Sequence, residues 1–187
     1  MRRIKVKKLI VSFNTYDWIG YCTGLILRSP QDFEIVIVRS QNEDPIIGFE
    51  TLCEEARYEQ RKYDLFKIGK KLGIRKMNNL RYSKDIDKNK LAMELQLHIA
   101  FGAVSEVYYT NTPLLTEIFD EVENKMKKIK FYSYGRPRFS RVKERIELTE
   151  TERDIKRELP AYIVGAARKE DREFPLMVER FWSSEIK

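Results

Sequence analysis

The chain has 187 residues, a length typical of one compact domain, and 42% of them are hydrophobic, which excludes a disordered tail. Lysine and arginine total 36 against 29 acidic residues, and the net charge of +7 weakly favours an anionic partner. Two cysteines, Cys22 and Cys53, are too few for a disulfide framework or a thiolate zinc site, so we expect reduced core thiols in a cytoplasmic protein. No apolar run is long enough to cross a bilayer, and no membrane partner is expected.

Apolar runs of strand length alternate with segments of helical periodicity. The expected strands are residues 4–12, 33–38, 77–82, 106–110, 129–134 and 146–149. The expected helices are residues 18–27, 50–72, 91–101, 113–125 and a last one capped by Thr149. This alternation predicts an α/β fold, a Rossmann-like three-layer sandwich with a mainly parallel sheet. We expect residues 1–187 to form a single domain, with a basic C-terminal extension of the sheet from about residue 125.

Ligands of parallel sheets bind beyond the carboxyl ends of the strands. The loops to consider are therefore residues 12–17, 39–45, 80–85 and 110–113. The residues expected to bind a ligand there are Asn14, Tyr16, Asp17, Arg39 and Asn111. Loop capping is the alternative role for the polar ones. Trp18 either stacks on a ring of the ligand or packs in the core.

Residues 12–20 follow the first strand and read SFNTYDWIG. This layout resembles the first motif of the PIG-L, or LmbE-like, N-acetylglucosamine deacetylases, which reads Pro-His-Pro-Asp-Asp-Glu with a glycine two residues further on. In that motif the His and the second Asp bind zinc, and the first Asp is the general base. Phe13, Tyr16 and Thr15 stand at those three positions, and Gly20 matches the glycine. The resemblance implies that the scaffold is kept and the hydrolytic groups are lost.

Weaker matches follow in the same order as in the family. They are residues 61–64 with the Leu-Gly at 72–73, then Lys156, Leu159, Tyr162, and Glu179 with Phe181. In such a comparison these are scaffold positions. The family's later His-x-Asp-His motif falls on residues 111–117, which read NTPLLTE and contain no histidine. His98 is the chain's single histidine and lies in an apolar helix, either as a plain helix residue or as a general base. We therefore expect a degenerate member with no bound metal and no cofactor.

The strongest charge feature is residues 125–145, which contain nine lysine and arginine residues and one acidic residue. The residues expected to bind nucleic acid are Lys127, Lys128, Lys130, Arg136, Arg138 and Arg141. Aromatic residues such as Tyr134 are interleaved with them and could stack on bases. The alternative is a solvated strand edge whose aromatic residues face the core.

The leading hypothesis is a catalytically degenerate domain retained for binding an anionic ligand, which is a nucleic acid, a nucleotide or a phosphorylated sugar. A metal-independent enzyme that acts on a sugar or nucleotide in the same pocket is one alternative. A structural or interaction subunit of a larger assembly, with a protein partner, is the other. Salt-sensitive binding to nucleic acid would favour the first hypothesis. Turnover of a substrate would favour the enzyme, and a defined complex on size analysis would favour the structural subunit.

Overall fold

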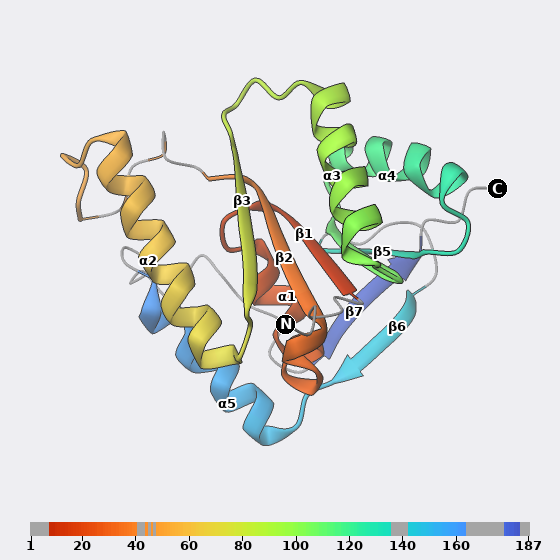
Figure 1. Ribbon diagram of the computed structural model, residues 1–187. Coiled ribbons are helices and arrows are strands. Elements are labelled where there is room, and N and C mark those ends of the chain that lie inside the picture. Colours follow the sequence, from red (N-terminus) through yellow and green to blue (C-terminus); the bar gives the residue numbers. More distant parts are fainter. Residues whose placement is uncertain are drawn as a thin grey trace, which may run out of the picture.

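The computed structural model describes residues 8–40, 44, 46, 48–135, 142–163 and 178–183. Strands and helices alternate through this part of the chain (Figure 1). Its elements are β1 (Lys8–Asn14), α1 (Asp17–Arg28), the 3-10 turn η1 (Pro30–Asp32), β2 (Phe33–Arg39), α2 (Glu54–Leu72), β3 (Lys76–Tyr82), α3 (Lys88–Gly102), β4 (Glu106–Thr110), α4 (Pro113–Lys125), β5 (Lys130–Tyr134), β6 (Val142–Glu147), α5 (Glu150–Glu158), the 3-10 turn η2 (Leu159–Tyr162) and β7 (Val178–Ser183). No helix in the described part combines the length and apolar character that a bilayer span needs.

The described strands form one sheet in the order β3-β2-β1-β4-β5-β7-β6. The first five strands in this order run parallel, whereas β7 pairs antiparallel with both β5 and β6. The predicted α/β class and mainly parallel sheet are therefore confirmed. The antiparallel pair at the far edge extends the sheet after β5.

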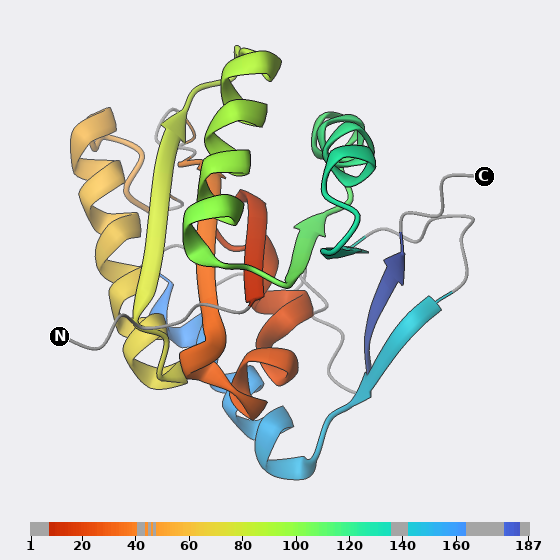
Figure 2. The same ribbon diagram turned by 45° about the vertical axis from the view of Figure 1, so that its right-hand side comes forward.

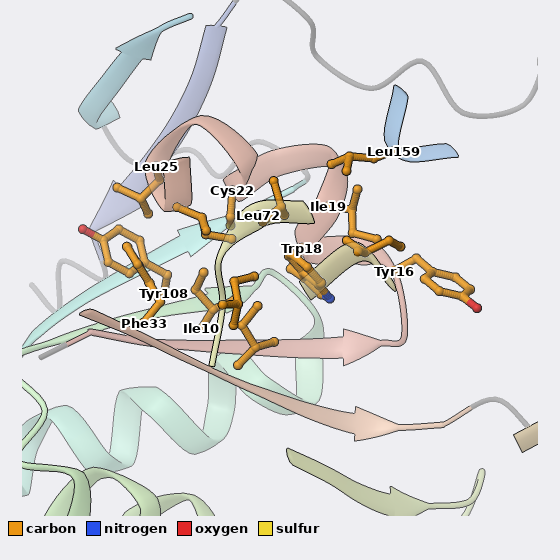
Figure 3. Packing of buried hydrophobic residues seen from close by; sticks show 14 of the residues in the cluster. Ile10, Tyr16, Trp18, Ile19, Cys22, Leu25, Phe33, Leu72, Tyr108 and Leu159 are labelled. Atoms are coloured by element: carbon orange, nitrogen blue, oxygen red, sulfur yellow. The ribbon is translucent and has the colours of Figure 1, made fainter. Parts of the chain in front are cut away.

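Helices cover both faces of the sheet, so the sandwich has three layers (Figure 2). Side chains of α1, α2 and η2 pack on one face, and those of α3 and α4 pack on the other. Along β1, Ile10 points into the first cluster and Leu9 and Val11 point into the second. Burial on both faces explains why the central strands are mostly apolar instead of alternating between apolar and polar residues. Figure 3 shows Trp18 and Cys22 of α1 packed over the first face.

Several predicted boundaries differ from the observed ones. β1 continues to Asn14, two residues beyond the predicted end, and its predicted residues 4–7 lie outside the described part. α2 begins at Glu54 and not at residue 50, because Cys53 before it has an extended backbone with φ −68° and ψ 165°. Cys53 is exposed, so the prediction that it is a core thiol was wrong, whereas Cys22 is buried. β7 was not predicted as a strand.

Candidate functional site

The carboxyl ends of β1 and β4 lie side by side at the point where the strand order changes direction. β1 leads into α1 on one face of the sheet, and β4 leads into α4 on the other. Such a switch point is where open parallel sheets bind their ligands. The two strand ends are tied together, because the backbone N–H of Phe13 donates to Thr110 Oγ1 at 3.0 Å. The hydroxyl of Tyr134 donates to the carbonyl of Val11 at 3.2 Å from β5.

Asn14 and Asp17 form a closed turn at the end of β1. The backbone N–H and the Nδ2 of Asn14 both donate to Asp17 Oδ2, at 3.2 and 3.1 Å. The Oδ1 of Asn14 is buried and has no hydrogen-bond partner among the described residues. Trp18, by contrast, is fully buried, and its indole N–H donates to the carbonyl of Thr15 at 3.1 Å. Trp18 is therefore a core residue, and the hypothesis that it stacks on a ligand was wrong.

The three residues at the positions compared with the zinc motif are engaged in the protein's own packing. Phe13 is partly buried against the apolar cluster under α3 and α4. Thr15 is fully buried, and its hydroxyl donates to the carbonyl of Ser40 at 3.0 Å. Tyr16 is buried on the other face, and its hydroxyl donates to Asp64 Oδ2 at 3.3 Å (Figure 3). Tyr16 therefore has a structural contact that sequence reasoning missed, because Asp64 lies 48 residues away on α2.

Arg39 ends β2 directly beside the end of β1, where it is the register partner of Asn14. Its guanidinium lies 3.6 Å from Asp44 Oδ2, measured from Nη2. The backbone carbonyl of the same Asp44 accepts a hydrogen bond of 2.8 Å from Nη2 of Arg61. Asp44, which follows β2, is thus contacted by two arginines. Arg61 has the scaffold role that the family resemblance implied.

Asn111 follows β4 at the same edge of the sheet. Its backbone N–H donates to the carbonyl of Tyr134 at 2.8 Å, and its Oδ1 accepts a bond of 3.2 Å from the Thr116 hydroxyl. Thr112 caps α4 by accepting from the N–H of Leu115 at 3.3 Å. The carboxyl ends of β1, β2 and β4 thus carry four of the predicted residues, Asn14, Asp17, Arg39 and Asn111. The side chain of Tyr16 is buried in the core instead.

A second polar cluster lies near the opposite ends of the strands and was not predicted. Glu34 is fully buried in the apolar strand β2, and it accepts bonds from Lys76 Nζ at 2.6 Å and Asn78 Nδ2 at 2.5 Å. Nδ1 of His98 lies 3.1 Å from the same carboxylate. Burial alone would raise the pKa of Glu34, but the hydrogen bonds from His98 and Lys76 and the charge of Lys76 outweigh it and lower the pKa. The sequence signal was an acid inside an otherwise apolar strand.

A third polar cluster, built on a buried ion pair, joins the C-terminal elements to α1. Lys156 Nζ and Glu179 Oε1 lie 2.6 Å apart, and both side chains are fully buried. The Glu179 carboxylate also accepts from the backbone N–H groups of Gly24 and Leu25, at 2.9 and 3.1 Å. Burial raises the pKa of Glu179, and Lys156 offsets part of this effect. The motif matches at Lys156 and Glu179 therefore mark one structural contact.

The structure describes only part of the basic segment. Lys127, Lys128 and Lys130 are exposed at the start of β5. They lie at the amino-terminal ends of the parallel strands, whereas Asn14 and Asn111 lie at the carboxyl ends. Arg136, Arg138 and Arg141 lie outside the described residues, beyond the other end of the strand. Tyr134 is fully buried, with its hydroxyl close to Thr110 Oγ1 at 3.0 Å, so the hypothesis that it stacks on bases was wrong.

No protein-family model matches the chain, and no curated protein is similar to it in sequence. Solved structures do match. N,N'-diacetylchitobiose deacetylase from Pyrococcus horikoshii matches with a TM-score of 0.63 and 13% identity, over 84% of this chain and 69% of that one. The A40926 pseudoaglycone deacetylase Dbv21 matches with a TM-score of 0.67 and 12% identity, over 96% and 97% of the two chains. The conserved protein TT1542 from Thermus thermophilus matches with a TM-score of 0.59 and 15% identity, over 96% and 95%.

The fold is that of the LmbE-like deacetylases. A zinc ion in this fold would need about three protein ligands of the His, Cys, Asp or Glu type. Within the described ranges, no group of three such side chains is placed to hold a metal ion. The chain's single histidine, His98, is bonded to Glu34 at the other end of the strands. The donors among the described residues therefore do not fit a catalytic zinc.

Proposed function

We propose that this chain is a catalytically degenerate LmbE-like domain, retained to bind an anionic ligand at the carboxyl edge of its sheet. One observation carries the proposal. The side chains at the three motif positions, Phe13, Thr15 and Tyr16, are engaged in packing and internal hydrogen bonds. A site with a phenyl ring, a buried hydroxyl and a core tyrosine at these positions has neither a general base nor imidazole and carboxylate ligands for zinc.

The switch point keeps features that suit a phosphate or another anion. α1 and α4 both begin there, and helix N-termini favour negative charge through their dipoles and free N–H groups. Asn14 adds a buried carbonyl oxygen with no donor among the described residues, and an unmade bond of this kind costs about 1–3 kcal/mol. A ligand hydroxyl would satisfy this oxygen after a small shift of the turn. A phosphorylated sugar or a nucleotide offers both groups.

The comparisons add modest support for a sugar. Two of the similar proteins are deacetylases by name, and one of them acts on N,N'-diacetylchitobiose. Nucleic acid is less well supported than a small ligand, because Lys127, Lys128 and Lys130 lie at the opposite edge from Asn14. A nucleic acid bound by these lysines would occupy a separate surface.

The test is a thermal-shift and calorimetry panel of phosphorylated sugars, nucleotides and short DNA and RNA strands. We expect a phosphorylated sugar or nucleotide to bind, and Asp17→Asn to tighten binding about two- to fivefold, because it removes a negative charge from the N-terminus of α1. Asn14→Ala should weaken binding. The control is Glu147→Gln, which also removes one negative charge but lies exposed on β6, away from the N-terminus of α1. This variant should leave the affinity for the ligand unchanged.

Four results would count against the proposal or redirect it. Binding by no member of the panel would contradict it directly. Affinity that Asp17→Asn leaves unchanged would place the anion elsewhere. Turnover of a sugar or nucleotide without metal would favour the enzyme reading instead. Salt-dependent binding to oligonucleotides that Lys127→Ala and Lys130→Ala weaken would move the ligand to the lysine surface.

A further inference from the structure

Among the described strands, β3 lies at one end of the sheet, and the exposed large apolar side chains of α2 and α3 flank it. β3 lies between α2 and α3 in both views of the molecule (Figures 1 and 2). Exposed side chains from the two helices are Tyr63 and Phe66 of α2 and Met93, Leu97 and Phe101 of α3. An edge strand with unpaired backbone groups is a template for pairing, and apolar patches on a surface mark interaction sites.

Grooves run along both faces of the β3 edge. The groove between α2 and β3 has a volume of about 570 Å³, and its wall includes Phe66, Lys70 and Met77. The groove between α3 and β3 has a volume of about 540 Å³, and its wall includes Leu97 and Phe101. The edge strand and both apolar helix faces therefore form one surface, which we call the β3 surface. It lies away from the β1–β4 switch point and is independent of the ligand proposed there.

The first part of β3 has the regular backbone that another strand could pair with. Its regular register with β2 runs from Lys76 to Asn79 and is followed by a bulge, where Arg81 has a φ of 60°. Lys76 forms an ion pair with the buried Glu34, with 2.6 Å between Nζ and Oε2. The sequence between Lys76 and Arg81 carries no charge. β3 exposes charges only at Lys76 and Arg81, one toward each end, whereas β6 exposes Arg145 and Glu147 within the strand.

The exposed face of α2 is complementary to itself when reversed. Glu59, Tyr63, Phe66 and Lys70 follow one another at intervals of four, three and four residues, so they lie along one stripe of the helix. All four are exposed. The stripe has an acid at one end, a base at the other and two aromatic rings between them. Two antiparallel copies would place each Glu59 opposite the other copy's Lys70 and each Tyr63 opposite a Phe66.

The sheet geometry brings these stripes together. A two-fold axis perpendicular to the sheet would pair β3 with its copy in antiparallel fashion and keep the two α2 helices on the same face. Strands in a sheet are about 4.8 Å apart, and helices packed over neighbouring strands come within about 8–10 Å of each other. α3 would meet its own copy on the opposite face. The same operation would therefore bury the apolar residues of both helices.

The exposed area is of the size that a dimer needs. Tyr63, Phe66 and Phe101 are 57%, 64% and 86% exposed, and at roughly 200 Å² for each ring they contribute about 400 Å². That is about half of the roughly 800 Å² that each partner buries in a standard interface. Met93, Leu97 and the strand edge add to it. We infer that the β3 surface binds a second copy of this chain, forming a two-fold dimer with a sheet continuous across both copies.

The first test is the mass of the full chain in solution by light scattering and sedimentation at micromolar concentrations. We expect twice the chain mass of 22.4 kDa. Phe66→Glu and Phe101→Glu should each give the single-chain mass with an unchanged circular dichroism spectrum, because both rings are largely exposed. Glu147→Lys on the other sheet edge is the matched control and should remain dimeric. A single-chain mass for the wild type, or a dimer that both phenylalanine variants leave intact, would overturn the inference.

A charge swap tests the orientation. Glu59→Lys and Lys70→Glu should each weaken the dimer on the order of tenfold, because each places like charges at two symmetric contacts. The double variant should restore wild-type affinity. The two residues are about 16 Å apart along one helix, so this rescue cannot arise within a single chain. A double variant that is weaker than both single ones would contradict the antiparallel α2 pairing.

Discussion

At the scale of single residues, the buried acids Glu34 and Glu179 have pKa values that move in opposite directions. Burial raises the pKa of Glu179, and Lys156 opposes this only in part. For Glu34, burial is outweighed by His98 and Lys76, so the pKa falls below its usual value of 4.5. A lowered pKa in the folded state means that the unfolded chain binds the proton more tightly. The contribution of Glu34 to stability is therefore present above pH 4.5 and is lost as the pH falls through the folded pKa.

Glu34→Gln should lower the free energy of unfolding by about 1–3 kcal/mol at neutral pH, because it removes the charged acceptor of Lys76. The difference from the wild type should shrink as the pH falls below 4.5, where the wild-type carboxyl becomes protonated as well. Urea unfolding of both proteins at a series of pH values measures this difference. A difference that stays constant down to the acid limit would show that the charge of Glu34 is not the cause.

Sequence reasoning at this scale identified which residues gather at the sheet edge but not how each side chain is used. Asn14, Asp17 and Asn111 could be placed there because strands that run parallel end at the same edge. Tyr16 was misjudged because its partner, Asp64, is distant in the sequence. Tyr134 was misjudged because strand alternation allows either face, and only the packing of β5 against β4 decides which.

At the scale of elements, α5 is set by local sequence and could be predicted closely. Thr149 accepts from the N–H of Glu152 at 3.2 Å, and the Glu152 carboxylate accepts from the N–H of Thr149 at 2.8 Å. This reciprocal pair is a capping box, which sequence spacing alone signals. β7 is the opposite case. Its partners β5 and β6 are set by nonlocal pairing, which no local pattern encodes.

Thr149→Ala should lower the free energy of unfolding by about 1 kcal/mol, since it leaves the first turn of α5 without its cap. Thr151→Ala is the control, because Thr151 is an exposed residue inside the same helix. Chemical denaturation of the three proteins gives the comparison. Equal losses for the two variants would mean that a general effect of threonine removal, and not the cap, is being measured.

At the scale of the whole molecule, alternation of strands and helices predicted the α/β class, and the structure confirms it. The strand order could not be predicted from alternation, since it depends on which helix crosses to which face. That order creates the switch point between β1 and β4 and leaves β3 at an edge. The ligand proposed at the switch point and the dimer proposed at β3 both depend on this strand order, which local sequence does not encode.

The central proposal is that this chain, whose fold is that of the LmbE-like deacetylases, holds no catalytic zinc, and the zinc content of the purified chain tests it most directly. Elemental analysis after incubation with excess zinc and removal of unbound metal should find far less than one zinc per chain, because Phe13, Thr15 and Tyr16 provide no ligand set. About one zinc per chain, lost when Asn14 or Asn111 is replaced by alanine, would contradict the account.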